Sequence, residues 1–348
     1  MSKKVPRVLL IADSLHAGKG GISRVARLMA KVLAERAQYG SLHAEGITLS
    51  DTEAPADIHL PMQTFAGSRG RFVLSAIRHG FSCRHVIFDA PPLAQLEALP
   101  PLRWRPSLGF VHGIEVWENA PAKYVTAAKR LRFMLANSEF TKMKAESLHG
   151  GFARARTCWL ATEEDEPPAD SLPLSSRPPA ALIVGRLIAD RPKGHRELIA
   201  CWPAVVYAVP DAVLHIVGGG PDRPALESLA KCSPAASNIQ FHGFVPDDKL
   251  CEHYANVRLL AMPSRGEGFG LVYIEAMRHG LPVIGSILDA ASEVLVDGET
   301  GFTVDQNDLS ALQSALIQLL KDDDWAARMG AAGRSRWLEH FRFGTFRR

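Results

Sequence analysis

A glycine-rich loop between two glutamates is the stretch of this 348-residue sequence best equipped for chemistry. It reads PSRGEGFGLVYIEAM from Pro263 to Met277, and seven residues separate Glu267 from Glu275. An apolar run precedes the loop and a helical pattern follows from about Leu271, so the loop joins a strand to a helix. Amides that start a helix lack an intrahelical acceptor and attract anions such as a diphosphate. Because a carboxylate can accept hydrogen bonds from the vicinal hydroxyls of a sugar, the pattern predicts a site for a phosphorylated sugar. The alternative is that Glu275 only complements the helix dipole and that Glu267 is solvated.

The loop belongs to the second of two predicted α/β domains. The chain is long enough for two cores, and four consecutive acids followed by five prolines interrupt its alternation of strands and helices over 163–179. We therefore predict an N-terminal domain over residues 1–165, a linker over 166–179 and a C-terminal domain over 180–348. Apolar runs that alternate with amphipathic stretches indicate a doubly wound parallel sheet in each domain. We expect two such Rossmann-like domains to face a cleft at the carboxyl ends of their strands.

Continuous apolar runs set the predicted strands. They cover 8–12, 85–88, 107–111 and 133–136 in the first domain, and 180–184, 212–217, 239–244, 257–262 and 282–285 in the second. The clearest helices are predicted over 22–36, 194–207, 224–231 and 273–279. Gly20 and Gly21 lie between the first strand and the first helix, where they fit either a tight turn or an anion-binding loop.

Over nearly its whole length the chain resembles retaining glycosyltransferase family 4. The motifs that carry the resemblance, besides the E-x7-E pattern of Glu267 and Glu275, are Gly20-Gly21, His112-Gly113, Gly185-Arg186-Leu187 with Lys193-Gly194, Gly218-Gly219-Gly220-Pro221, Gly243-Phe244-Val245 and the run DGETGF that starts at Asp297. The resemblance implies the GT-B fold, which is an α/β architecture of two Rossmann-like domains. It also implies hexosyl transfer from a UDP- or GDP-linked sugar.

The resemblance also assigns roles to residues of this chain. Arg186 and Lys193 would bind the donor diphosphate and stabilise it as it leaves, Glu267 would bind the transferred sugar, and His112 would lie beside the reacting carbon. The nucleotide part of the donor would be bound by Gly20, Gly21, Val245, Phe269, Gly270, Leu271, Val272 and Glu275. Cations directed at a developing negative charge commonly give the largest catalytic contribution. Alternatively, His112 is a turn histidine whose hydrogen bonds are satisfied within its own domain.

The implied reaction retains the anomeric configuration and needs neither a metal nor a cofactor beyond the donor. The one run of acids that could suggest a metal site, Asp322-Asp323-Asp324, lies between two helical stretches, where we expect a helix cap or a solvated turn. Two other functions stay open. A GT-B-fold epimerase or phosphorylase would share the nucleotide or phosphate site, and a non-catalytic subunit would only bind nucleotide-sugar. The presence of all four charged donor-site residues argues against the latter.

Two departures from the family pattern concern the donor site. Six residues separate Arg186 from Lys193, two more than is usual, so that Arg191 could share the phosphate role. The pair Asp289-Ala290 stands where the family often has two glycines, which we expect to change how the transferred sugar is held.

Positive charge is concentrated in the first 165 residues, with 22 Lys and Arg against 15 Asp and Glu, whereas the remainder has 18 and 22. We therefore expect an anionic partner for the first domain, either a glycan acceptor on a lipid diphosphate in cell-surface polysaccharide synthesis or an anionic membrane surface, and no nucleic acid. Residues 69–84 and 123–135 combine basic and apolar side chains, which suits lipid headgroups or ordinary amphipathic helices.

No apolar run approaches the ~20 residues of a membrane span, and five cysteines without a paired motif favour reduced thiols. We expect a cytoplasmic location, peripheral at the inner face of the membrane.

Overall fold

The computed structural model describes residues 5–169, 172–190 and 192–348. The chain divides into two compact units, Met1–Leu160 with Arg347 and Ala161–Phe346 with Arg348. The division therefore falls shortly before residue 165, where the sequence predicted the end of the first domain.

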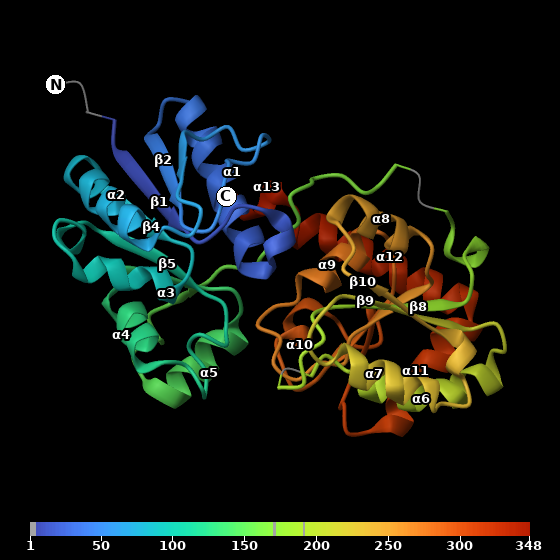
Figure 1. Cartoon of the computed structure of the whole chain (residues 1–348). Coiled ribbons are helices and arrows are strands. Elements are labelled where there is room, and N and C mark those ends of the chain that lie inside the picture. The colour runs from blue at the N-terminus through green and yellow to red at the C-terminus, as the bar shows by residue number, and fades with distance from the viewer. Residues whose placement is uncertain (1–4, 170–171, 191) are drawn as a thin grey trace. The chain divides into compact units, whose positions relative to one another are not determined.

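The first unit is built around a parallel sheet of seven strands in the order β3-β2-β1-β4-β5-β6-β7 (Figure 1). The strands are β1 Arg7–Ala12, β2 His43–Thr48, β3 Met62–Thr64, β4 His85–Phe88, β5 Ser107–Val111, β6 Phe133–Ala136 and β7 Arg156–Thr157. In β1, Leu9, Leu10, Ile11 and Ala12 are fully buried. This is why β1 is a continuous apolar run, since a strand covered on both faces has no solvent-facing positions.

Five α-helices and three short 3-10 helices connect these strands. They are α1 Gly21–Gln38, α2 Arg69–Ser82, α3 Pro91–Ala94, α4 Ala122–Arg130 and α5 Glu139–His149, with η1 Ala17–Lys19, η2 Gln95–Ala98 and η3 Leu102–Trp104. One buried cluster joins Phe72 of α2 to Phe88 and Leu102. A second lies around Trp117 and Phe152. The unit thus has the crossover helices that parallel strands need.

The second unit has a parallel sheet of six strands in the order β10-β9-β8-β11-β12-β13. The strands are β8 Ala180–Val184, β9 Val213–Val217, β10 Ile239–Gly243, β11 Leu259–Ala261, β12 Val283–Ser286 and β13 Gly301–Val304. The reversal of strand order beside β8 places the ends of β8 and β11 at the topological switch point, where sheets of this kind bind ligands.

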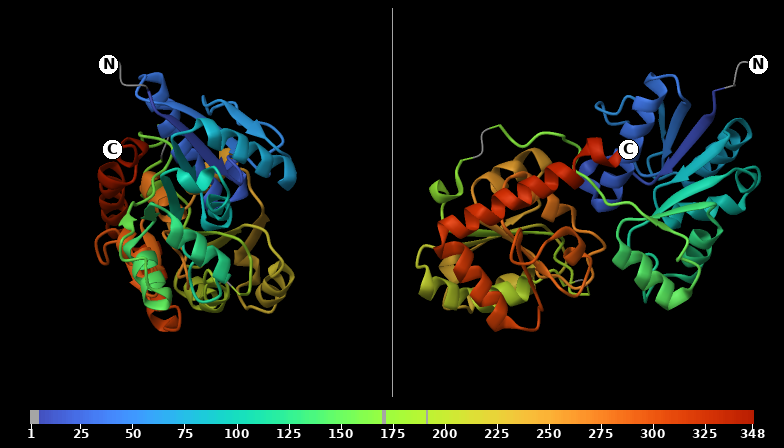
Figure 2. Two further views of the ribbon diagram at one scale, coloured as in Figure 1. Left: turned by 90° about the vertical axis from the view of Figure 1, so that its left-hand side faces the viewer. Right: turned by 180° about the vertical axis from the view of Figure 1, so that it is seen from behind.

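Helices cover both faces of this second sheet. They are α6 His195–Ala208, α7 Arg223–Lys231, α8 Asp247–Ala255, α9 Leu271–Arg278, α10 Ala291–Val294, α11 Leu309–Lys321, α12 Asp323–His340 and α13 Phe343–Phe346, with η4 Leu174–Ser176 and η5 Ala236–Asn238. Figure 1 shows α6, α7 and α11 on one side of the sheet and α8, α9 and α12 on the other, and Figure 2 shows how far α12 runs along the unit. Among all helices of the described residues, none combines the length and apolar character needed to cross a bilayer.

The segment that leads into β8 is bound to the second unit. The Thr162 amide donates to the Phe341 carbonyl oxygen at 2.8 Å, and the Trp337 indole N–H donates to the Thr162 hydroxyl at 3.1 Å. Arg177 is 2% exposed and donates to the carbonyl oxygens of Leu172, Tyr254, Val257 and His279. The described part of the predicted linker 166–179 therefore ends in a buried anchor, while residues 170–171 lie outside the described residues.

The predicted fold class, two doubly wound Rossmann-like domains, is confirmed. The predicted strands 85–88, 107–111, 133–136 and 180–184 agree with β4, β5, β6 and β8 at both ends. The predicted strand 257–262 is too long, because β11 covers only Leu259–Ala261. The strands β2, β3, β7 and β13 were not predicted, since none of them is a continuous apolar run.

Candidate functional site

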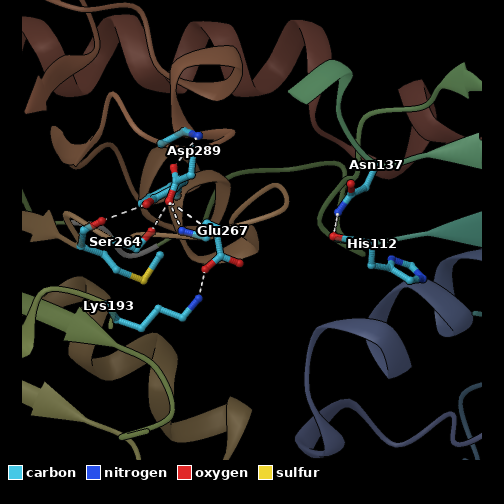
Figure 3. A network of polar contacts seen from close by, with 10 residues as sticks. His112, Asn137, Lys193, Ser264, Glu267 and Asp289 are labelled. Carbon is cyan, nitrogen blue, oxygen red and sulfur yellow. Dashed lines mark hydrogen bonds and ion pairs between the residues drawn. The ribbon is translucent and has the colours of Figure 1, made fainter. Parts of the chain in front are cut away.

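Lys193 and Glu267 form an ion pair in the second unit (Figure 3). The two side chains come from different loops, because Lys193 follows β8 and Glu267 follows β11. Gly194 allows these loops to meet: its φ is +98°, and a Cβ there would lie 2.6 Å from Pro263. Two charged residues that the sequence analysis placed in one site thus lie together at the carboxyl edge of the second sheet.

Asp289 holds the loop that carries Glu267. It is 1% exposed, and one carboxylate oxygen accepts hydrogen bonds from the Ser264 hydroxyl and from the amides of Gly266 at 3.3 Å and Glu267 at 3.0 Å. The other oxygen accepts from the Ala291 amide at 3.0 Å. Burial raises the pKa of the Asp289 carboxyl, and the Ser264 hydrogen bond opposes that rise. The side chain that replaces a family glycine therefore binds the backbone of the loop itself.

Removal of this carboxylate should destabilise the second unit. In Asp289→Ala, a hydroxyl and three backbone amides lose their acceptor, so we expect the free energy of unfolding to fall by about 3 kcal/mol. Urea unfolding measures this, with Asp211→Ala, an exposed acid of the same unit, as the matched control. If both variants unfold at the same urea concentration, Asp289 does not organise the loop.

The first turn of α9 presents backbone amides beside Glu267. Gly270 is the N-cap residue with φ +90°, and a Cβ there would collide with the ring of Tyr273. Leu271 and Val272 follow as the first helical residues, are half-buried, and carry amides of the kind that have no intrahelical acceptor. Phe269 differs from this group, because its side chain is 1% exposed and packs edge-on against Phe341 with 5.9 Å between ring centroids. Its side chain belongs to the core, which leaves only its backbone for a ligand.

Glu275 lies on the buried side of α9. It is 9% exposed, and the Tyr254 hydroxyl donates to its carboxylate at 2.8 Å. The Tyr254 ring stacks on His279 with 5.2 Å between centroids, and burial lowers the pKa of His279 to about 3. The recorded hydrogen-bond donor to the Glu275 carboxylate is therefore a neutral hydroxyl, and the histidine stacked on that tyrosine is also neutral. The sequence did not single out Tyr254, which lies in a different helix.

Arg186 and Val245 follow two other strands of the same sheet. Arg186 comes directly after Gly185 at the end of β8, and a Cβ added to Gly185 would touch the Lys193 side chain at 3.5 Å. Arg186 is exposed and, among the described residues, has no ion pair. Val245 is half-buried and follows β10. Both therefore lie at the carboxyl edge that carries Lys193 and Glu267. Arg191, which the spacing suggested as a further phosphate ligand, lies outside the described residues.

The acidic run at Asp322 begins a helix, as predicted. The Asp322 carboxylate accepts a hydrogen bond from the Trp325 amide at 2.8 Å and so caps α12. In the part of the chain that the structure describes, no group of three or more His, Cys, Asp or Glu residues is arranged to hold a metal ion.

His112 in the first unit has three polar partners around it. Its ring Nε2 lies 2.8 Å from the Asp89 carbonyl oxygen, its amide donates to the Glu115 carboxylate, and its carbonyl oxygen accepts from the Asn137 side chain at 2.9 Å (Figure 3). The ring also stacks on Phe110 with 5.7 Å between centroids. These contacts fix the position and the ring orientation of His112 at the carboxyl end of β5. None of the three polar partners was predicted.

Gly20 and Gly21 lie at the start of helix α1. Gly20 is the N-cap residue of α1 and Gly21 its first residue, and both are exposed. Nothing lies within 4 Å of a Cβ added at Gly20. The first amides of α1 are therefore open to an anion, in the same way as those of α9.

Asp89 should make the stability of the first unit depend on pH. It is 1% exposed and accepts a hydrogen bond from the Asp13 amide at 2.7 Å, and burial raises its pKa to about 7. Between pH 4 and 7 the folded chain therefore keeps a proton that the unfolded chain has lost, so stability should fall as pH rises through this range. The fall amounts to about 4 kcal/mol for a shift of this size. Urea unfolding at pH 5 and pH 8 should show a smaller difference in Asp89→Asn, and an unchanged difference would contradict the assignment.

Residues 178–322 match the family described as Glycosyl transferases group 1. The match lies within the second unit and covers less than half of the chain. The curated relatives include the GDP-mannose-dependent alpha-(1-6)-phosphatidylinositol monomannoside mannosyltransferase of Mycolicibacterium smegmatis, 36% identical over 174 residues, which are 48% of this chain and 45% of the relative. The N-acetyl-alpha-D-glucosaminyl L-malate synthase of Bacillus anthracis is 33% identical over 147 residues, 42% of this chain and 38% of the relative. The matches thus span about half the length of these relatives or less.

Solved glycosyltransferase structures match both units. HepE of Anabaena, crystallised with UDP and glucose, has a TM-score of 0.79 at 18% identity and aligns over 98% of this chain and 97% of its own. Sucrose-phosphate synthase of Thermosynechococcus elongatus has a TM-score of 0.80 at 21% identity, over 98% and 96%. The GT-B fold expected for the whole chain is therefore confirmed, and the residues that match the group 1 family lie in its C-terminal domain.

Proposed function

We propose that the chain is a retaining, metal-independent glycosyltransferase. It transfers a sugar from a nucleotide-sugar to a glycan or lipid-linked acceptor in cell-surface polysaccharide synthesis. The observation that carries the proposal is the Lys193–Glu267 pair, held by Asp289 beside the free amides at the start of α9. A cation, a carboxylate and a helix start together suit a sugar diphosphate, which presents negative charge and hydroxyls side by side.

The proposed reaction uses these groups in sequence. As the bond between sugar and diphosphate breaks, negative charge grows on the diphosphate, and Lys193, Arg186 and the amides of Leu271 and Val272 stabilise it. Glu267 binds hydroxyls of the transferred sugar, while an acceptor hydroxyl forms the new bond to the anomeric carbon and its proton passes to the departing phosphate. A diphosphate that takes Lys193 as its partner separates the ion pair, so donor binding itself frees the Glu267 carboxylate for those hydroxyls.

GDP-mannose is the first donor to test. Several relatives of the second unit carry GDP-mannose dependence in their names, whereas HepE was crystallised with UDP-glucose. A shared fold at this low sequence identity does not identify the donor of this chain. The donors named for the curated relatives therefore determine which compounds are screened first.

A thermal-shift screen of GDP- and UDP-sugars tests the donor site directly. A donor that binds only the folded chain adds about 2.7 kcal/mol of stability at 100 times its Kd. The donor with the largest shift is then incubated with acceptors, with and without EDTA, and the anomeric configuration of the product is read by NMR. Loss of turnover in EDTA that added metal restores would refute metal independence. An inverted product would refute retention, and conversion of the donor without an acceptor would identify an epimerase.

A further inference from the structure

An exposed basic and apolar surface covers one side of the first unit. It is formed by the outer face of α2 together with η3, and we define this α2–η3 surface by six residues: Arg71, Leu74, Arg78, Phe81, Arg103 and Trp104. Figure 1 shows α2 on the outside of the first unit. The surface lies outside every group assigned above to the donor or to His112.

The residues of α2 alternate between core and solvent with helical period. Phe72, Ala76 and Gly80 are buried, whereas Leu74 is 68% and Phe81 69% exposed. The outward face thus carries two large apolar side chains, Leu74 and Phe81. Arg71 precedes Leu74, and Arg78 lies between the two apolar residues, at helical spacing. A helix that only packs against its own domain has no need for apolar residues on its solvent face.

The short helix η3 extends this face. Arg105, directly after it, donates to the carbonyl oxygens of Gly80 at 2.9 Å and Phe81 at 3.2 Å, which fixes η3 against the end of α2. Trp104 is 67% exposed. A third large apolar side chain thus belongs to the same surface, and tryptophan is the residue that most favours the boundary between water and lipid.

The charge of the surface is positive. Residues 58–88 contain no Asp or Glu and four arginines, and η3 contributes Arg103. Glu97 lies beside Arg103, and the positive charge of Arg130 also acts on this carboxylate. The second basic stretch, residues 123–135, differs in degree: α4 exposes no large apolar side chain, and the stretch has one such residue, Phe133, which is 55% exposed. Basic charge and apolar groups are therefore combined on α2 and η3.

We propose that the α2–η3 surface binds the anionic headgroup layer of a membrane. Phe81, Leu74 and Trp104 insert at the level of the acyl boundary, while Arg71, Arg78 and Arg103 pair with lipid phosphates. Three large apolar side chains beside arginines, with no acid over residues 58–88, suit a layer that presents anionic headgroups above an apolar interior. The proposal goes beyond the glycosyltransferase function and does not depend on it.

Co-sedimentation with vesicles tests the proposal without measuring transfer. The full chain should bind vesicles of phosphatidylglycerol and phosphatidylcholine, and should release them at high salt. It should not bind phosphatidylcholine alone. Arg78→Gln should weaken binding about fivefold and Phe81→Ser about tenfold. Tyr207→Ser, which removes a 92% exposed aromatic residue from α6 of the second unit, is the matched control and should leave binding unchanged.

Tryptophan fluorescence locates the contact. Of the six tryptophans, Trp104 is the most exposed, so anionic vesicles should shift the emission to shorter wavelength and Trp104→Phe should remove most of that shift. Absence of binding to anionic vesicles at low salt would overturn the proposal, as would equal losses in Phe81→Ser and Tyr207→Ser. Self-association of the lipid-free chain that Phe81→Ser abolishes, without an effect on vesicle binding, would identify a second copy of the chain as the occupant instead.

Discussion

Replacement of Lys193 with alanine should lower kcat by about 100–1000-fold, the loss typical of removing one group that stabilises charge in a transition state. The physical reason is that Lys193 contacts Glu267, which lies in the loop that leads to the helix start proposed to hold the diphosphate. The chain should still fold. Without Lys193, the Glu267 carboxylate is left unpaired in a partly exposed position, where water can solvate it.

Steady-state kinetics with the donor found by the thermal-shift screen measure this effect, and Lys231→Ala, an exposed lysine of the same unit, is the control. Lys193→Arg keeps the positive charge and should recover part of the rate. If Lys193→Ala unfolds at the wild-type temperature and keeps full turnover, Lys193 does not belong to the donor site. The proposed reaction would then be wrong as well.

Replacement of Glu275 should act on nucleotide binding. If its carboxylate accepts hydrogen bonds from a ribose, Glu275→Gln should weaken donor affinity by about 10–100-fold, because hydrogen bonds to a charged group contribute about 1.5–3 kcal/mol. Glutamine keeps an oxygen that can accept from the Tyr254 hydroxyl, so the fold should persist. Glu275→Ala should lose transfer altogether and also destabilise the unit, since it leaves that buried hydroxyl without its acceptor.

Isothermal titration with the nucleoside diphosphate separates these two effects. Tyr254→Phe is the control, because it removes the hydroxyl that contacts Glu275 and leaves the carboxylate in place. Equal affinity in wild type and Glu275→Gln would show that the carboxylate serves only the packing of α8 against α9.

The strands that the sequence predicted are those buried on both faces of a sheet. Strands such as β8, AALIV, are covered on both faces and are therefore continuous apolar runs that the sequence displays directly. Strand β2 begins with His43 and contains Glu45 and Gly46, and β3 is three residues long at an edge of the sheet, so neither has such a pattern. What identifies them is pairing, of β2 with β1 and of β3 with β2, which is a long-range property.

The candidate site was predictable to a similar extent. The glycine loop between Glu267 and Glu275 predicted an anion and sugar site from residue types alone, whereas Lys193 was assigned to that site only through the resemblance to the family. The roles of Asp289 and Tyr254 were not predictable, because each depends on which neighbour a side chain meets across different loops or helices. The same holds for Asp89, whose raised pKa is caused by complete burial at the end of β4.

The hydrogen bonds of Thr162 and Arg177 determine where the second unit can be separated from the first. A fragment that starts at residue 180 would lose Arg177 and the partner of the Trp337 indole, and would expose a seam along α12. A fragment that starts at residue 161 retains both. The piece of chain that can fold as a separate unit thus reaches back beyond β8, into the proline-rich stretch that precedes this strand.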